Sequence, residues 1–410
     1  MKFNVIVSSP IWSLNGVNVF SANLVRELQH RGIPSEILLT QPHLPDPKPM
    51  SVPADIPVNR LPVKNEDVYG VRWAALIRYL EERAPCIYIP NHDIEHSAIC
   101  PALDNQVAVV GVVHSDDPQH YEHVGRLGSA WNHIVTVSKT VANETLAKNP
   151  ALADRLTVVP IGVRIPLEPP AVPSDSVRPL KLLYAGVFKQ QQKRILDLPK
   201  IVQRLAGEGI PVTLTIAGGG PDEADLVAAA EPLVQQGLIK FIGIVPHDEM
   251  PSLLQDHDVF LMTSAYEGMP NALLEAMGQG CIPVVTDIDS GIPEVVTDGE
   301  SGFLVPVGDI EQFAERITQL QRHPDLRQQL ASCAYSAVSQ GPYSIRAMAD
   351  SYLQVFEQAL AAAAQGKFQR PAGGKVIPPP HMRPIWRHYL PLPIYEAARL
   401  SRRTLRAMAR

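Results

Sequence analysis

The sequence predicts an α/β protein of two domains, each built on a parallel β-sheet that helices cover on both faces. Three observations support this prediction. The chain has 410 residues, more than a single hydrophobic core usually holds. Apolar runs of strand length alternate with stretches of helical periodicity, and a proline-dense stretch separates two such series. The runs are nearly continuous in Val and Ile, which is typical of strands buried on both faces.

The first domain is expected at residues 1–165. Between its first two strands lies a helical stretch in which Val19, Leu24 and Leu28 recur near helical spacing. Residues 41–62 are rich in proline and are expected to form a long loop, and loops of that length tend to be functional or mobile. The strand-like runs of this domain fall at 3–9, 35–40, 86–90, 107–113, 133–138 and 156–161.

A hinge is expected at the proline-dense residues 166–179, and a second domain at 180–344. Each strand-like run of the second domain precedes a helical segment. These runs fall at 180–186, 212–218, 239–245, 258–264 and 282–287. Two such arrays predict two Rossmann-like domains that face each other across a cleft. Ligands of such sheets bind beyond the carboxyl ends of the strands, so the loops that follow strands are the candidate sites.

The chain is expected to end in a closing helix, 345–364, and then a linker and basic tail, 365–410. The linker is rich in Gly and Pro and has little reason to pack. Beyond Lys367 nearly every charged residue is Lys or Arg, and aromatic residues such as Trp386 are interleaved with them. Residues 383–410 are therefore either a helix that contacts an anionic membrane or an arm that is solvated or packs on the body.

The composition is that of an ordinary soluble protein, with 45% apolar and 19% charged residues. Four widely spaced cysteines argue against a disulfide framework or a zinc site and favour a reducing compartment. The first residues fit a strand better than a signal peptide, and no run approaches the roughly 18 apolar residues of a membrane-spanning helix. A cytoplasmic protein is expected, with the tail as the segment that would reach the inner face of the membrane. Its acidic body argues against nucleic acid as a partner.

Two glutamates, Glu267 and Glu275, stand in the segment YEGMPNALLEAMGQG, residues 266–280. The first follows a predicted strand, and the second lies just over one turn inside the next helix. A carboxylate at Glu275 can accept two hydrogen bonds from a vicinal diol such as that of ribose, and Glu267 can accept from hydroxyls of a second sugar. The alternative is a surface helix whose glutamates are incidental.

The residues between these glutamates predict an anion site at a helix N-terminus. Pro270 suits the first helical position because it has no N–H to satisfy there. Backbone amides at a helix N-terminus bind anions. The amides available here belong to Gly268, Met269 and Asn271.

Two further loops of the second half carry charge or glycine. Gly186 ends a predicted strand, and Lys193–Arg194 begin the next helix, where two cations can neutralise a diphosphate without metal. A solvated helix start is the alternative. Gly218 opens a run of three glycines after another strand, which permits close backbone approach but is weak evidence alone. The turns around Gly291–Glu294 and Gly299–Gly302 are expected to be structural.

The order of these motifs resembles family 4 of the retaining glycosyltransferases, whose members have the two-domain GT-B fold. The resemblance covers about residues 180–310 strongly and the first half more weakly. Its specific part is the Glu-x7-Glu signature with its flanks, and the glycine turns are not specific. The motifs are the strand-end glycine, Lys193–Arg194, Ala-Gly-Gly-Gly-Pro, Glu-Gly-Met-Pro-x4-Glu-Ala-Met-x-x-Gly, Pro-Val-Val and Gly-x-Pro-Glu.

The resemblance implies a role for each matching residue. Glu275 would hold the donor ribose, Glu267 would contact the donor sugar near its transferring carbon, and Lys193 would bind the diphosphate. The amides from Gly268 to Asn271 would face oxygens of the donor sugar or phosphate. The family usually has Arg after the strand-end glycine, where this chain has Val187, so Lys189 or Arg194 would have to supply the second charge.

In the first half the resemblance places Asn15–Gly16 against the donor phosphate. The family usually has Gly-Gly here, and Asn tolerates the same left-handed backbone geometry. His114, at the end of a predicted strand, matches a histidine that contacts the donor sugar, although a lone histidine there is often only structural. Ser138 and Lys139 are expected to cap a helix, with or without a ligand contact.

Metal binding is not expected. Asp116–Asp117 resemble a metal-binding pair, but the family is metal-independent. His92, Asp93 and His96 have a spacing that could bind metal, yet contact with an acceptor or plain loop polarity is the favoured interpretation. No cofactor is expected beyond the nucleotide-diphosphate sugar, which is a co-substrate.

The resemblance thus implies a retaining transfer of sugar from a nucleotide-diphosphate sugar to a hydroxyl of a glycan or lipid-linked acceptor. Such a reaction belongs to the synthesis of glycans, glycolipids or cell-envelope polysaccharide. In it an oxygen of the leaving group helps to deprotonate the acceptor on the same face of the sugar. The alternatives are a catalytically inactive nucleotide-sugar-binding or regulatory protein, or another GT-B enzyme such as a sugar-nucleotide epimerase.

Overall fold

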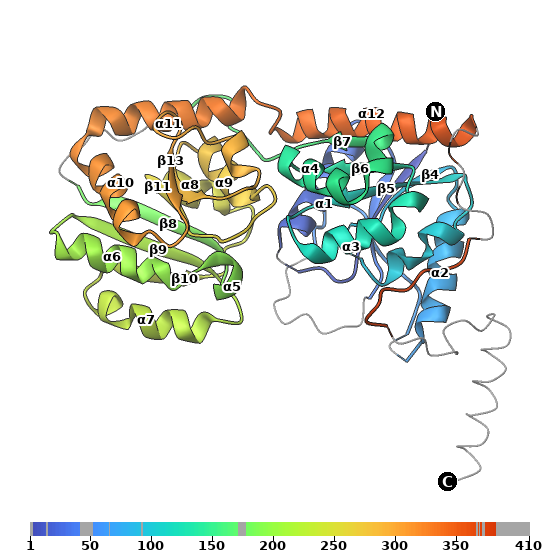
Figure 1. Ribbon diagram of the computed structural model, residues 1–410, viewed down its shortest axis with the longest axis horizontal. Coiled ribbons are helices and arrows are strands. Elements are labelled where there is room, and N and C mark those ends of the chain that lie inside the picture. Colours follow the sequence, from blue (N-terminus) through green and yellow to red (C-terminus); the bar gives the residue numbers. More distant parts are fainter. Residues whose placement is uncertain are drawn as a thin grey trace, which may run out of the picture. The chain divides into compact units, whose positions relative to one another are not determined.

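The structure, a computed structural model, describes residues 3–13, 15–41, 52–64, 66–91, 93–170, 178–365, 368, 370 and 374–382. The chain forms two compact units (Figure 1). Unit 1 comprises the chain up to Thr136, Glu144–Thr157 and the chain from Ala349 on, and unit 2 comprises Val137–Asn143 and Val158–Met348. The expected boundaries at residues 165 and 344 therefore differ from the compact units by a few residues, because short segments near them pack with unit 2.

Within the described residues, unit 1 carries a parallel seven-stranded sheet in the order β3-β2-β1-β4-β5-β6-β7. The central strand β1 pairs in parallel with β2 on one side and β4 on the other. The chain therefore winds outward in two directions from β1, and the loops after β1 and β4 meet where the winding reverses. The strands are β1 Asn4–Ser9, β2 Ser35–Leu39, β3 Val58–Arg60, β4 Cys86–Ile89, β5 Val107–Val113, β6 His133–Thr136 and β7 Leu156–Val158.

Two of the helices associated with this sheet begin at a side-chain cap. Asn15 caps α1 by accepting a hydrogen bond from the amide of Asn18, and Asp117 caps α3 by accepting one from Gln119. The helices are α1 Gly16–His30, α2 Tyr69–Glu81, η1 His96–Ala102, α3 Pro118–Leu127, η2 Gly128–Ala130, α4 Lys139–Lys148, η3 Pro150–Arg155 and α12 Ile345–Ala364.

Unit 2 carries a parallel six-stranded sheet in the order β10-β9-β8-β11-β12-β13 within the described residues. The strands are β8 Leu180–Val187, β9 Val212–Gly219, β10 Ile239–Gly243, β11 Val259–Met262, β12 Ile282–Asp287 and β13 Phe303–Pro306. The helices are α5 Gln190–Lys193, α6 Asp197–Gly207, α7 Glu223–Gln235, α8 Met250–Gln255, α9 Asn271–Gly278, η4 Ile292–Glu294, α10 Ile310–Arg322 and α11 Pro324–Ser339. The winding reverses between the adjacent strands β8 and β11, which brings their following loops together.

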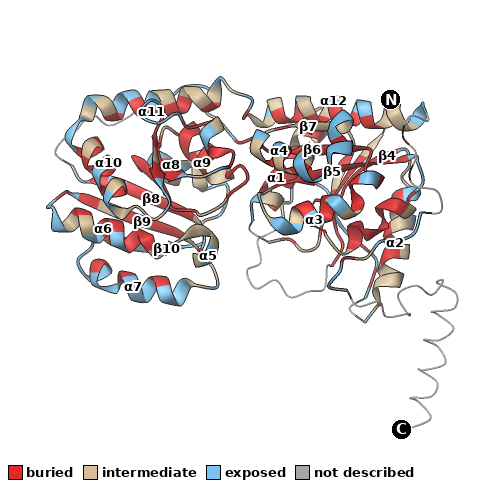
Figure 2. Ribbon diagram, in the orientation of Figure 1, coloured by how far each residue is buried: buried red, intermediate tan, exposed pale blue. Residues whose placement is uncertain are grey.

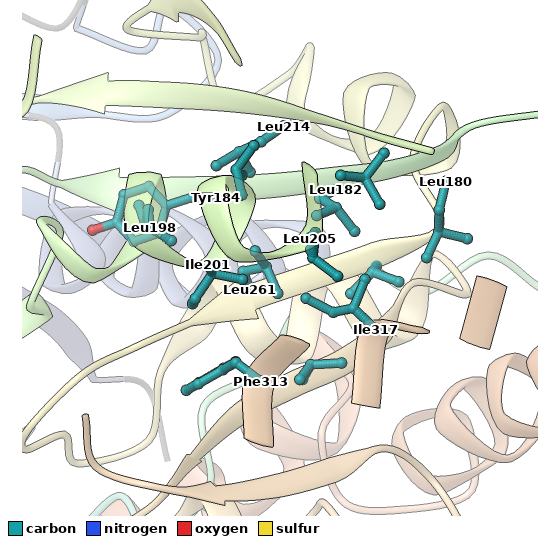
Figure 3. Packing of buried hydrophobic residues seen from close by; sticks show 14 of the residues in the cluster. Leu180, Leu182, Tyr184, Leu198, Ile201, Leu205, Leu214, Leu261, Phe313 and Ile317 are labelled. Carbon is teal, nitrogen blue, oxygen red and sulfur yellow. The ribbon is translucent and has the colours of Figure 1, made fainter. Parts of the chain in front are cut away.

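The core of each unit lies on its sheet, and the strands are largely buried (Figure 2). In unit 2, Leu180, Leu182 and Tyr184 of β8 pack with residues of α6 and α10 (Figure 3). This near-continuous burial explains the apolar runs of the sequence, because strands covered on both faces have no solvent side for polar residues.

Two strands fall where the sequence analysis placed none. β3 lies within the predicted loop 41–62, of which residues 42–51 are outside the described residues. It is a short, largely exposed strand that pairs with the edge of β2, so it has no apolar pattern to reveal it. β13 is a four-residue strand between turns, too short for a periodicity to be recognised.

The prediction of an unpacked linker after the closing helix is wrong at two of its described residues. Phe368 and Arg370 are buried in unit 1. The Arg370 guanidinium donates to the carbonyl oxygens of Leu103 (3.2 Å), Asp104 (2.6 Å) and Val107 (2.5 Å). A single side chain with five N–H donors thus anchors a segment whose composition predicted solvation.

The backbone of Ile377 is also fixed, since its N–H donates to the carbonyl of Ala98 (2.9 Å) and its carbonyl accepts from Arg126. The proposed membrane-contacting tail, 383–410, lies outside the described residues. None of the described helices has the length and apolar character that a membrane crossing requires.

Candidate active site

The candidate site in unit 2 forms where the loops after β8 and β11 meet. Two hydrogen bonds to backbone carbonyls join these loops: Ala265 N–H donates to the carbonyl of Gln192 (2.7 Å), and the side-chain hydroxyl of Thr263 donates to the carbonyl of Lys193 (2.8 Å). Because β8 and β11 are neighbours in the sheet, residues about seventy positions apart in sequence are brought together here.

Lys193 and Glu267 form an ion pair at this junction. Lys193 Nζ lies 2.5 Å from Glu267 Oε1, and Ser264 Oγ donates to the same oxygen at 2.6 Å. The side chains of Lys193 and Glu267 are 17% and 7% exposed. Both bonds use Oε1, so Oε2 can accept a hydrogen bond from a hydroxyl, and the ammonium group has three N–H donors, of which this pair uses one.

Tyr184 lies near enough to Glu267 to feel its charge, and the sequence analysis did not single it out. Its hydroxyl donates to the carbonyl of Val187 (2.9 Å). Burial, with the charge of Glu267 as a smaller cause, raises the pKa of Tyr184 well above its usual value of 10.0. The hydroxyl therefore stays protonated and supports the strand end at Gly186, where an added Cβ would lie 3.2 Å from it.

Glu275 lies just over one turn inside α9, as predicted, and it has a partner that the sequence analysis did not identify. His247 Nε2 lies 2.9 Å from Glu275 Oε1. His247 comes from the segment between β10 and α8. The two side chains are 28% and 15% exposed, so the pair sits at the surface rather than in the core.

The segment between the two glutamates is buried from Gly268 to Pro270. The Met269 side chain is 3% exposed and packs at Gly291, where an added Cβ would lie 2.6 Å from its Cε. The carbonyl of Gly268 accepts a hydrogen bond from Gly291 N–H at 2.6 Å. Pro270 is the N-cap and Asn271 the first helical residue, one position later than predicted. The helix N-terminus lies where the sequence analysis expected an anion site.

The glycine run after β9 has a steric explanation. Gly218 has a φ of +133°, and a Cβ there would lie 1.9 Å from the carbonyl oxygen of Gly186. A Cβ at Gly220 would lie 2.4 Å from the carbonyl oxygen of Phe188. The glycines allow β9 and the loop after β8 to approach closely at their carboxyl ends, next to the candidate site.

The other cations predicted here are placed differently. Arg194 has a φ of +48°, and its Nε lies 2.8 Å from a carboxylate oxygen of Asp197, which is itself 2% exposed. Lys189 is exposed at the start of α5. Val187, where the resemblance expects Arg, is 44% exposed at the end of β8. Of these cations, Lys193 is the one that the structure pairs with Glu267.

In unit 1, His114 follows β5 and belongs to a buried polar cluster at the carboxyl ends of the strands. Asn91 Nδ2 donates to the carbonyl of Ser8 (3.3 Å) and to Ser21 Oγ (3.0 Å), so its Oδ1 accepts from His114 Nε2 (2.9 Å). This bond requires a proton on Nε2. Burial, and to a lesser degree His120, lowers the pKa of His114 from 6.5 to about 3. The imidazole is therefore neutral at physiological pH.

The loop after β1 holds Gly16 as the first residue of α1, and Gly16 is exposed. Asn15 has a φ of −150°, so the predicted left-handed geometry is wrong. The reason is capping: an N-cap residue adopts an extended conformation so that its side chain can accept from the first turn, as Asn15 does from Asn18.

The polar pairs considered as metal ligands have structural partners. Asp93 Oδ1 accepts from the amide of His96 (3.3 Å) and contacts its Nδ1 (2.8 Å), and Thr40 donates to the other carboxylate oxygen. His92 lies outside the described residues. Asp117 caps α3, and Asp116 accepts a hydrogen bond from Tyr121 (2.7 Å). Both groups thus have structural partners, while the ligand atoms of Asp93, Glu95 and His96 also lie within 4.8 Å of one another, as a metal ion would require.

Ser138 and Lys139 are at a helix start, as expected. Ser138 Oγ accepts from Val141 N–H (3.2 Å), and Glu294 Oε1 accepts from Lys139 N–H (2.7 Å). Glu294, of the Gly-x-Pro-Glu turn, therefore caps α4, which is a structural role.

Residues 173–337 match the model of a family described as Glycosyl transferases group 1. A lipopolysaccharide core biosynthesis glycosyltransferase, LpsE, of Rhizobium meliloti is 34% identical over 165 residues, which are 40% of this chain and 46% of LpsE. A glycogen synthase of Mycobacterium tuberculosis is 27% identical over 318 residues, 73% of this chain and 72% of that protein. The matched segments of four curated relatives at 33–39% identity span 36–46% of those relatives' length.

Most of the chain shares its fold with solved structures. The structure of TarM from S. aureus, crystallised as a variant in complex with fondaparinux, α-GlcNAc-glycerol and UDP, matches with a TM-score of 0.71 at 14% identity. The match covers 87% of this chain and 100% of TarM. The predicted fold class, α/β with two parallel-sheet domains of the GT-B type, is confirmed. The family model and the relatives support a glycosyltransferase family with this fold.

Proposed function

We propose that this chain is a retaining, metal-independent glycosyltransferase of family 4 that transfers a sugar from a nucleotide-diphosphate sugar to a hydroxyl acceptor. One observation carries the proposal: Lys193 and Glu267 meet at the reversal point of the unit 2 sheet, next to a helix N-terminus that holds Glu275 one turn further on. These residues lie inside the segment that matches the glycosyltransferase family model.

The charges of the reaction explain why these groups are needed. Glycosyl transfer develops positive charge on the sugar and negative charge on the departing diphosphate. The Lys193 ammonium can bridge Glu267 and a phosphate oxygen, and the amides at the start of α9 can bind phosphate or sugar oxygens. Fixed cations and dipoles stabilise a developing anion strongly because they need not reorganise.

The other residues that the sequence analysis predicted for the site have supporting roles on this proposal. Glu267 Oε2 accepts from a hydroxyl of the donor sugar, and Glu275 accepts from the ribose. His114 contacts the donor sugar as a neutral hydrogen-bonding group, since its pKa of about 3 keeps it uncharged. Gly16 presents its amide to the donor phosphate. Gly186 and Gly218 shape the loop that holds Lys193.

The acceptor that we propose is a glycan or lipid-linked glycan of the cell envelope. The name of one relative places that protein in lipopolysaccharide core biosynthesis. The tail, 383–410, has many arginines and Glu396 as its lone acid, and we propose that it binds the anionic surface that carries such acceptors. Truncation after Met382 should abolish sedimentation with phosphatidylglycerol vesicles and leave donor binding intact. Unchanged sedimentation would refute the membrane contact.

A thermal-shift panel of UDP-, GDP- and ADP-sugars tests the donor site. A ligand that binds the native state raises the melting temperature by mass action. One donor class should shift the wild type and fail to shift Glu275→Ala. Glu300→Ala, which removes an exposed glutamate of the same unit, is the matched control and should respond as the wild type does. A folded wild type that responds to none of the three classes would refute the proposal.

Val187 favours one alternative, a protein that binds the donor but does not turn it over. An apolar, 44% exposed side chain stands where the resemblance expects Arg. Donor binding without release of nucleoside diphosphate, with acceptor extracts present, would support this alternative.

A further inference from the structure

His247 is the partner of Glu275, and its role is not accounted for by the fold. It lies in the irregular segment between β10 and α8, and its side chain is 28% exposed. The hydrogen bond that the structure gives this side chain, within the described residues, goes to Glu275 Oε1 at 2.9 Å. Replacing such a partly exposed side chain removes little buried apolar surface, so His247 contributes little to the free energy of unfolding.

The direction of this hydrogen bond is set by chemistry. An ionised carboxylate only accepts hydrogen bonds, so His247 Nε2 must carry the proton and donate it. The bond occupies Oε1 and restrains the side-chain torsions of Glu275. The second oxygen, Oε2, is then held in one direction, as a bound hydroxyl requires.

An unrestrained glutamate on a helix surface has several rotamers. Ordering it on ligand binding costs free energy, and a neighbour that orders it beforehand removes that cost. A glutamate side chain therefore binds a diol more tightly when a second side chain, from another helix or loop, fixes the orientation of its carboxylate.

We propose that His247 is a positioning residue, which orients Glu275 toward the ribose diol of the donor nucleotide and thereby sets a preference for ribonucleotide over 2′-deoxyribonucleotide donors. The inference rests on the proposed function. It adds that the ribose selectivity resides in the pair of residues and not in Glu275 alone.

The experiment measures dissociation constants of UDP, GDP and ADP and of their 2′-deoxy counterparts by calorimetry. The nucleotide that binds the wild type should bind His247→Ala about tenfold more weakly, as expected for the loss of one hydrogen bond to a charged group. The deoxynucleotide should lose much less, so the ratio between the two constants shrinks. The melting temperature without ligand serves as the check on folding.

Two further variants separate positioning from a general structural effect. His247→Gln can place an amide N–H near the site of Nε2, and it should restore most of the ribose preference. In the background of Glu275→Ala, adding His247→Ala should cause no further loss, because the histidine acts through the glutamate. If His247→Ala loses affinity equally for the ribonucleotide and the deoxynucleotide, or keeps full affinity for both, the inference is overturned. The proposed function still stands in either case, provided that the wild type binds a nucleotide. A wild type that binds none of the three nucleotides overturns both.

Discussion

Lowering the pH from 7.5 to 5.5 is expected to destabilise unit 1, because three of its histidines are buried in the neutral form. Burial is the largest cause at each position. Burial lowers the pKa of His114 and His123 from 6.5 to about 3, and that of His133 to about 4, and at each position a neighbouring residue lowers the pKa further by a smaller amount. The neighbours are His120, Arg126 and Arg155, respectively.

The sign follows from proton binding. Each folded pKa lies below the value of about 6.5 for an unfolded histidine, so below pH 6.5 the unfolded state binds more protons than the folded state. The free energy of unfolding therefore falls as the pH drops from 6.5 towards the folded pKa values. Between pH 7.5 and pH 5.5 the protonation of each histidine lowers the free energy of unfolding by about 1.4 kcal/mol, and the three together lower it by about 4 kcal/mol.

Tryptophan fluorescence can report on the unfolding of unit 1. The chain has four tryptophans; Trp12, Trp73 and Trp131 are buried in unit 1, and the fourth, Trp386, lies in the tail. Urea unfolding of the Trp386→Phe variant at both pH values should give a midpoint that is clearly lower at pH 5.5.

The histidines can then be removed one at a time. His133 Nε2 bonds Thr157 Oγ1 at 2.9 Å, and His133→Gln should reduce the pH effect by about 1.4 kcal/mol. His30→Gln, at an exposed position, is the matched control. A free energy of unfolding that is equal or higher at pH 5.5 would contradict the argument.

Three further outcomes are expected. Lys193→Met should weaken nucleoside diphosphate binding in calorimetry and lower the melting temperature, because Glu267 is left buried without its counter-charge. Adding Glu267→Gln to this variant should restore the melting temperature but not the affinity. Restoration of both would contradict the role of Lys193 in binding the diphosphate. Arg370→Ala should cost about 1–3 kcal/mol in urea unfolding and make the segment after α12 sensitive to trypsin, since three backbone carbonyls lose their donor; unchanged protection would show that Arg370 is not the anchor. Val187→Arg should raise the rate of donor turnover without tightening ribose recognition, and EDTA should leave that rate unchanged; a rate that falls with EDTA and returns with Mg²⁺ would refute metal independence.

Local patterns in the sequence predicted the sheets well. Runs such as 107–113 and 282–287 coincide with β5 and β12 because a strand buried on both faces must be apolar throughout. The start of α9 was placed within one residue, and Glu275 lies in its second turn as expected. The closing helix, 345–364, matches α12 in both bounds. Short or exposed strands such as β3 and β13 lack such a pattern and were missed.

Local signals were enough to predict the fold class, the alternation of strands and helices, and which loops carry chemical groups, because periodicity, capping and glycine turns act over a few residues. The partners of the two glutamates could be learned only from the folded chain. Glu267 is paired with a lysine 74 positions earlier, and Glu275 with a histidine 28 positions earlier. The burial of Arg370 likewise depends on carbonyls more than 260 positions away. Such contacts follow from the order of strands in the sheets, which no local pattern encodes.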